Sequence, residues 1–192
     1  MQADPARSIP SQVLAEARGL LIVRETKGGL ILGARSGQAM ASVRRDGTWS
    51  APAFFRVREG SLGLQAGWQQ ATFFHVLMTE AAVSTLHSNR FQLGLGLRVT
   101  SGPRTVGDGI GTADALGDVL VYADTSGVFG GVAVEGGSLS PDEKLNEAWY
   151  GLPATEVLAG RAAATDPEVR RWVELVEKCA RTEPARDPSD AR

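Results

Sequence analysis

The feature that most constrains the fold is the dipeptide Asp46-Gly47, which lies between the apolar run 40–43 and Trp49. A two-residue hairpin turn of type I′ requires positive φ angles, and glycine adopts them without strain. We therefore expect two antiparallel strands to meet at this turn. Pro52 follows closely, and because proline has no N–H for a sheet ladder, it marks an edge, a bulge or the end of a strand.

Glycines recur in the strand-like segment that follows. Gly60, Gly63 and Gly67 leave little side chain on this part of the chain. In a strand, such glycines mark sharp bends or the close approach of two backbones. The sequence therefore predicts a curled or closed sheet, in which Gly63 and Gly67 have structural roles, as do Trp49 and Pro52.

Further short elements are predicted on both sides of this stretch. Helices are expected from Ile9-Pro10 to Gly19, over 80–88 with Thr79 as the cap, and from Asp166-Pro167 to about residue 181. Strands are expected at 20–23, 30–33, 38–44, 72–78, 91–100, 119–123 and 128–134, with turns at 27–29, 35–37 and 124–127.

The predicted fold class is α+β. It consists of a strongly bent, mostly antiparallel sheet or a closed β-barrel, with short flanking helices and a C-terminal helix. Closure would remove the exposed edges that many short strands otherwise create. The C-terminal helix carries an apolar stripe through Trp172 and Val176, by which we expect it to dock on the sheet.

Composition and charge narrow the function classes. The chain has 192 residues, 43% hydrophobic and 22% charged, which is ordinary for one globular domain with its own core. A single cysteine, Cys179, excludes an intrachain disulfide and a cysteine-rich metal site. Residues 1–107 carry a net charge of +6, residues 108–156 a net of −8, and residues 157–192 a net of zero. This division favours a dipolar surface with one face for anionic partners, unless folding interleaves the halves and cancels the field.

The sequence offers little for catalysis. His75 lies in an apolar strand and His87 at a helix end, without a nucleophile and an orienting group, so a structural role is expected for both. No cluster of His, Cys and carboxylates has the spacing of metal ligands. Asp108, Asp114 and Asp118 crowd one stretch, where a solvated face is favoured over a calcium site. We expect no enzyme activity and no cofactor.

A series of short motifs runs along the chain. They are Ile9-Pro10, Ala17-Arg18-Gly19-Leu20, Lys27-Gly28-Gly29, Gly33-Ala34-Arg35-Ser36-Gly37, Asp46-Gly47-Thr48-Trp49-Ser50-Ala51-Pro52, Gly63-Leu64-Gln65-Ala66-Gly67, Phe91-Gln92-Leu93-Gly94, Gly102-Pro103, Gly127-Val128-Phe129-Gly130-Gly131-Val132, Glu135-Gly136, and Asn146 to Tyr150-Gly151. In this order they resemble the SYLF domain, a family of phospholipid-binding and often phosphoinositide-binding domains. Fungal members also bind and bundle actin, and many bacterial members are exported.

The resemblance implies a single SYLF-like domain over residues 9–181. Its family motifs fill 9–151, and a helical extension follows at 152–181. The remaining segments, 1–8 and 182–192, are polar and are expected to be disordered tails.

This resemblance implies a lipid-binding role for basic residues in the first half of the chain. Lys27 and Arg35 flank predicted glycine turns, where side chains and backbone N–H groups can receive a phosphate together. With Arg24, Arg44 and Arg45 they form the candidate lipid-binding set, because arginine suits bidentate contact with phosphate. For any one of them, an ordinary solvated position is the simpler interpretation.

These observations favour non-enzymatic binding of an anionic, phosphoinositide-like phospholipid at a membrane surface. The alternative is a protein-interaction module, either actin-binding-like or a scaffold for a partner in a bacterial envelope. No nucleic acid partner is expected. Residues 1–8 lack the apolar core of a signal peptide, and they alone precede Ile9. We therefore expect either a piece of a longer exported precursor, in the periplasm or envelope, or a cytoplasmic protein peripheral to the membrane.

Overall fold

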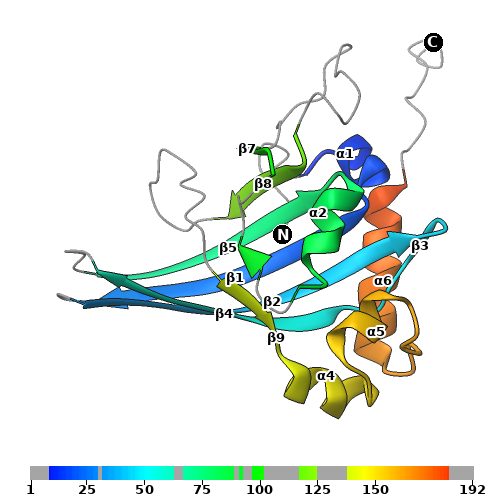
Figure 1. Ribbon diagram of the computed structural model, residues 1–192. Helices are drawn as coiled ribbons and strands as arrows, with labels where there is room; N and C mark the ends of the chain where they lie inside the picture. Colours follow the sequence, from blue (N-terminus) through cyan, green and yellow to red (C-terminus); the bar gives the residue numbers. More distant parts are fainter. Residues whose placement is uncertain are drawn as a thin grey trace, which may run out of the picture.

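The computed structural model describes residues 9–29, 32–62, 67–88, 91–92, 97–101, 117–124 and 138–181. Within these ranges a large curved sheet carries helices at one end, and the far ends of its long strands extend beyond them (Figure 1). In chain order the elements are α1 (Ser11–Glu16), β1 (Gly19–Gly29), β2 (Leu32–Arg45), β3 (Thr48–Trp49), β4 (Ala53–Leu62), β5 (Gly67–Leu77), α2 (Glu80–Thr85), β6 (Phe91–Gln92), β7 (Val99–Ser101), β8 (Val119–Asp124), β9 (Ser138–Pro141), α4 (Glu143–Tyr150), α5 (Ala154–Leu158) and α6 (Pro167–Ala180).

The sheet has the strand order β6-β9-β4-β2-β1-β5-β8-β7, and the short β3 pairs with β2. Every neighbouring pair is antiparallel except β7 and β8, which run parallel. The predicted α+β class and the mostly antiparallel sheet are therefore confirmed.

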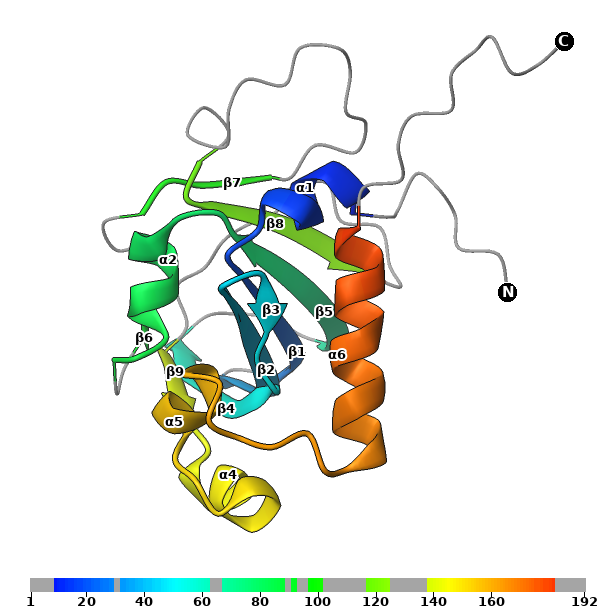
Figure 2. The same cartoon turned by 90° about the vertical axis from the view of Figure 1, so that its right-hand side faces the viewer.

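The sheet must be strongly bent for the chain to connect its edges. Seven strand-to-strand steps separate β6 from β7, which in a flat sheet amounts to about 34 Å. Only six residues lie between Gln92 and Val99, and a chain of that length reaches at most about 25 Å. Figure 2 shows the resulting curl, from β8 at the top through β5 and β1 to β4 and β9 at the bottom.

The sheet is not a closed barrel. Of the two forms that the sequence predicted, a bent sheet or a closed barrel, the closed barrel is therefore wrong. β6 and β7 end the strand order, and within the described ranges no ladder joins them. α2 lies on the open side of the curl (Figure 2). Its Ala82 and Val83, and Leu86 directly after it, are buried in the core there. A helix in the opening covers the apolar inner face of the sheet, so strand-to-strand closure is not needed.

Both faces of the sheet are buried where the helices lie. Leu21 and Val23 belong to a core with residues of α2 and α5, whereas Leu20 and Ile22 pack in a second core with residues of α1 and α6. Alternate residues of a strand point to opposite faces, so a strand covered on both sides needs apolar residues at every position. This explains the continuous apolar run at 20–23.

The hairpin predicted at Asp46-Gly47 is confirmed. Both residues have positive φ, 48° and 81°, and the turn pairs Arg44 with Trp49. Trp49 is buried in the second core. Pro52 immediately precedes β4, which begins at Ala53, so it marks the end of a strand as expected.

Two predicted glycine turns are wrong. Residues 27–29 form the end of β1, and residues 35–37 lie within β2, which replaces the two predicted strands around them. β1 and β2 pair without interruption, from Gly19 opposite Val43 to Gly29 opposite Gly33. Gly37 serves a different purpose, because a Cβ atom there would lie 2.5 Å from the Arg24 carbonyl oxygen in the neighbouring strand. Close approach of two backbones, not a turn, requires this glycine.

The strand predicted at 91–100 is also wrong as one element. Its described residues form β6 and β7, which lie at opposite ends of the strand order. An alternating pattern cannot by itself locate a break between two strands. The predicted strand at 128–134 and Gly63 lie outside the described residues. Gly67 is the first residue of β5, opposite Gly29.

The three predicted helices are confirmed as α1, α2 and α6, with the predicted caps on the last two. The Thr79 hydroxyl accepts the N–H of Ala82 at 3.3 Å, and the Asp166 carboxylate accepts the N–H of Glu168 at 2.8 Å. Both caps provide an acceptor for N–H groups that have no hydrogen-bond partner within the first turn of the helix. In the described part of the chain, no helix has the length and apolar character needed to cross a membrane.

The predicted docking of the C-terminal helix is confirmed. α6 lies along the sheet beside α1 (Figure 2), and its Val176 is buried in the second core. Trp172 adds a polar contact, since its Nε1 donates to the Oγ of Ser42 at 2.9 Å. Ser42 is fully buried in β2, so this hydrogen bond fixes the helix at one position on the sheet.

Candidate functional site

The five candidate lipid-binding residues are spread along β1 and β2. Lys27 lies directly opposite Arg35 in the ladder, two positions before the end of the pairing at Gly29 and Gly33, so the register brings these two positions together. Arg24 lies in the middle of β1, opposite Gln38, and its side chain is exposed.

Arg44 and Arg45 have hydrogen-bond partners within the fold. Arg44 Nη1 donates to the carbonyl oxygen of Ala15 in the last turn of α1, at 2.5 Å. Arg45 Nε donates to the carbonyl oxygen of Leu158, the last residue of α5, at 3.3 Å. Successive strand residues point to opposite faces of the sheet. Arg44 therefore binds the C-terminal carbonyl end of α1 on one face, and Arg45 binds that of α5 on the other face. The sequence pattern did not indicate this structural role, and a part for the two arginines in lipid binding stays a prediction.

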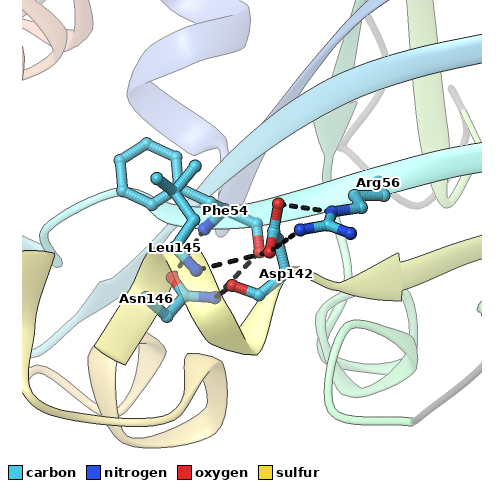
Figure 3. Close-up of polar contacts among 5 residues, drawn as sticks. All are labelled: Phe54, Arg56, Asp142, Leu145 and Asn146. Carbon is cyan, nitrogen blue, oxygen red and sulfur yellow. Dashed lines mark hydrogen bonds and ion pairs between the residues drawn. The ribbon is translucent and has the colours of Figure 1, made fainter. Parts of the chain in front are cut away.

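A second set of polar contacts joins α4 to β4, and the sequence did not predict it (Figure 3). Arg56 Nε and Nη2 donate to the two carboxylate oxygens of Asp142, each at 2.5 Å. Asn146 Oδ1 accepts the backbone N–H of Phe54 at 2.8 Å, and its Nδ2 donates back to the Phe54 carbonyl at 2.9 Å. A paired strand would offer the same donor and acceptor to Phe54.

The contacts follow a regular spacing. Tyr150 continues the series, since its hydroxyl donates to the Pro52 carbonyl at 2.8 Å. Four residues of a helix rise about 6 Å and two residues of a strand about 6.6 Å, so the two elements stay in step. The helix positions 142, 146 and 150 thus face the strand positions 56, 54 and 52.

Charge and burial set the protonation of this site. The hydrogen bonds from Arg56 lower the pKa of the Asp142 carboxyl below its ordinary value, with a further contribution from the N–H of Leu145. Burial raises the pKa of the Tyr150 hydroxyl to about 12. At neutral pH the carboxylate therefore remains an acceptor and the phenol a donor, as these contacts require.

An aromatic patch, formed by Phe54, Trp149 and Tyr150, lies beside these contacts. The rings of Phe54 and Tyr150 are stacked with centroids 6.0 Å apart, and Trp149 is tilted against both, at 5.6 Å from Phe54 and 6.5 Å from Tyr150. The Trp149 side chain remains 46% exposed, and among the described residues only Leu175 is another exposed large hydrophobic residue. Aromatic residues exposed in this way are typical of protein interfaces.

The two histidines and the one described residue of the acidic stretch lie at other elements of the fold. His75 is buried in β5, and His87 is half-buried after α2. Asp118, the one described member of the acidic stretch, accepts the backbone N–H of Arg98 at 2.7 Å, and this hydrogen bond lowers the pKa of its carboxyl. In the described ranges, no three side chains among His, Cys, Asp and Glu are grouped to hold a metal ion.

The missed site carried two signals in the sequence. Pro141-Asp142-Glu143 is a helix start, with aspartate as a cap, and Gly151 ends that helix in the left-handed conformation at φ 66°. Recognising both would have predicted α4. The role of Asn146 had no such signal, because a polar residue inside a helix normally faces solvent.

Comparisons with known proteins agree with the motif order. The family model described as Ysc84, Las17-binding protein actin regulator, matches residues 58–179. The chain is 31% identical to the LAS seventeen-binding protein 3 of Saccharomyces cerevisiae over 172 residues, which is 84% of this chain and 38% of that protein. It is 29% identical to the human SH3 domain-containing YSC84-like protein 1 over 162 residues, 81% of this chain and 47% of the relative.

The chain spans less than half the length of these curated relatives. No solved structure matches it at a significant level. The names of the relatives describe binding and regulation, not an enzymatic reaction. Because the family model matches more than half of the chain and the yeast relative aligns with 84% of it, the chain belongs to the Ysc84 family, whose shared domain is the SYLF domain.

Proposed function

We propose that this domain is a non-enzymatic protein-interaction module whose partner belongs to the actin-regulating machinery. Its relatives carry names of that kind, as Las17-binding proteins and actin regulators. The observation that carries the proposal is the aromatic patch on α4 and β4. Trp149 is 46% exposed there, although a tryptophan gains most when it is buried.

Pelleting with purified actin filaments tests this proposal. Trp149→Ala removes the exposed ring but leaves the polar contacts of α4, and we expect affinity for filaments to fall about tenfold, as for an interface hot spot. Leu175→Ala is the matched control, because Leu175 is 53% exposed on α6, outside the patch. Wild-type binding by Trp149→Ala, or equal loss in both variants, would refute the aromatic patch as the binding surface.

A second candidate function is binding of anionic phospholipid at a membrane surface. It is favoured by the register, which places Lys27 directly opposite Arg35, and by the net charge of +6 over residues 1–107. A basic residue near an anionic leaflet contributes about 1 kcal/mol, so a handful of them gives reversible binding. Arg24 adds an exposed charge on the same strand as Lys27.

Co-sedimentation with liposomes that contain phosphatidylserine or a phosphoinositide tests the second candidate. Lys27→Glu with Arg35→Glu should weaken binding by about thirtyfold or more, and added salt should weaken binding of the wild type. Arg170→Glu with Arg171→Glu makes the same change in charge at two exposed positions of α6 and should have little effect. Equal losses from both pairs would indicate a diffuse charge effect without a site.

A further inference from the structure

The way α4 is attached to the sheet is unusual for a short helix. A surface helix normally buries an apolar stripe, but the one buried residue of α4 is Asn146, while Trp149 on the same helix stays exposed. Burial of an amide is tolerated only where its hydrogen bonds are made. Polar contacts therefore hold this helix in place, together with the half-buried Tyr150, which packs against the core of α2 and α5. The tryptophan does not act as its anchor.

Asn146, together with the backbone N–H of Asp142, takes the place of a neighbouring strand. The ladder between β4 and β9 ends at Phe55, opposite Pro141. Phe54 is the next position. Its N–H donates to the Asn146 side chain, and its carbonyl group accepts both from the Asn146 amide and from the backbone N–H of Asp142, the latter at 2.9 Å. The same Asn146 amide also donates to the Asp142 carbonyl at 3.0 Å, which ties it to its own helix. The amide thus joins helix and strand at a single position.

That position also determines where Trp149 lies. Phe54 holds Asn146 through its backbone and contacts Trp149 through its ring, with centroids 5.6 Å apart. Asn146 and Trp149 are three residues apart, so they lie on neighbouring turns of one side of α4. A slip of the helix by one residue would rotate it by about 100° and remove Trp149 from Phe54.

We infer that Asn146 is the positioning residue of the aromatic patch: its hydrogen bonds to Phe54 fix the register of α4 and thereby present Trp149 to a protein partner. The inference rests on the proposed function for its binding consequence. Its structural part, the placement of Trp149 by Asn146, is tested independently of any partner.

Asn146→Asp is the decisive variant. It keeps an acceptor for the Phe54 N–H, but its carboxylate faces the carbonyl oxygens of Phe54 and Asp142, which the amide had contacted as a donor. We expect the contribution of Trp149 to fluorescence, measured as the difference from a Trp149→Phe background, to shift toward that of a solvent-exposed indole. Binding to actin filaments should fall about as far as in Trp149→Ala.

Acid should restore the wild-type signal in this variant. Near about pH 5 the introduced carboxyl, whose pKa is raised by burial and by the two carbonyl oxygens, can be protonated and donate again. Asp142 stays ionised under these conditions, because Arg56 lowers the pKa of its carboxyl. Asn146→Ser, which is uncharged and too short for these contacts, should lose the Trp149 signal at both pH values.

Val176→Ala provides the control for a general loss of stability. Val176 is buried in α6, in the second core, and is not part of the aromatic patch. All variants are compared at a temperature at which each remains folded, as checked by circular dichroism. Val176→Ala should keep both the Trp149 signal and filament binding.

The outcomes separate the two hypotheses. A wild-type Trp149 signal in Asn146→Asp and Asn146→Ser at pH 7.5 would overturn the inference, whatever the binding result. A shifted signal without acid recovery would overturn the hydrogen-bond explanation. If the wild-type protein does not bind filaments, the proposed function fails, and the fluorescence measurements alone then decide whether Asn146 positions Trp149.

Discussion

Gly37→Ala tests the idea that close backbone approach, and not a turn, explains the glycines of this sheet. Gly37 lies within β2, and its φ angle is not positive. Alanine is therefore acceptable to the backbone at this position. The added methyl group, however, would lie 2.5 Å from the carbonyl oxygen of Arg24, where ordinary contacts begin at 3.4 Å. About 0.9 Å must be gained by moving one strand away from the other.

The expected cost is high because neither strand is free to move. β1 is paired with β2 on one side and with β5 on the other, so a shift at Arg24 disturbs two ladders. The contacted atom belongs to the backbone and cannot rotate away as a side chain would. Overpacking typically costs 1–3 kcal/mol, and we expect a loss near the upper end, about 3 kcal/mol of unfolding free energy.

Gly47 provides the comparison, because it is required for the opposite reason. Its φ is +81°, and a Cβ atom there would meet nothing within 4 Å. Gly47→Ala should cost about 1–2 kcal/mol through backbone strain alone, and Gly47→Asn less, because asparagine adopts this conformation readily. At Gly37 the order should reverse, since asparagine is larger than alanine.

Urea unfolding followed by circular dichroism measures these differences as shifts in the midpoint at constant m value. The reasoning is refuted if Gly37→Ala costs less than about 0.5 kcal/mol, or if Gly37→Asn is more stable than Gly37→Ala. Either result would mean that β1 and β2 adjust easily at this position and that close approach is not what requires the glycine.

Substitutions at three further residues test the contacts that hold the helices. The pKa of the Asp142 carboxyl is lower in the folded protein than in the unfolded chain, so the ionised carboxylate stabilises the fold at neutral pH. This stabilisation begins to be lost as the pH falls below the unfolded-state pKa of about 4, and it is gone once the pH is below the folded-state pKa. Asp142→Asn should therefore be less stable at pH 7 but lose less stability on acidification, and an unchanged slope in pH-dependent urea unfolding would contradict this. Trp172→Phe removes the N–H to Ser42 and should cost about 1 kcal/mol, whereas Trp172→Ala should approach about 3 kcal/mol; a Trp172→Phe variant that melts like the wild type would show that the hydrogen bond contributes nothing. Arg45→Met keeps the apolar stem but loses the Leu158 contact, so α5 should exchange amide hydrogens faster than in Arg170→Met, and equal exchange would remove Arg45 as a stabilising residue.

The sequence by itself predicted the elements whose causes are local. The Asp46-Gly47 turn follows from backbone φ preferences, the Thr79 and Asp166 caps from N–H groups at helix starts, and the end of a strand at Pro52 from its missing N–H. The apolar stripe of α6 likewise predicted its docking through Trp172 and Val176. Each of these features depends on a few neighbouring residues, so a short stretch of sequence contains enough information.

The tertiary structure alone decided features that depend on residues far apart in the chain. Gly37 looks like a turn residue until β1 is placed beside it, and Arg44 and Arg45 look like free surface charges until α1 and α5 supply carbonyl groups. Whether the bent sheet closes was set by α2 in the opening between its edges. Asn146 meets Phe54 across 92 residues of sequence. Such pairings are fixed by the total free energy of packing, which no local pattern contains, and they determine that Trp149 remains at the surface.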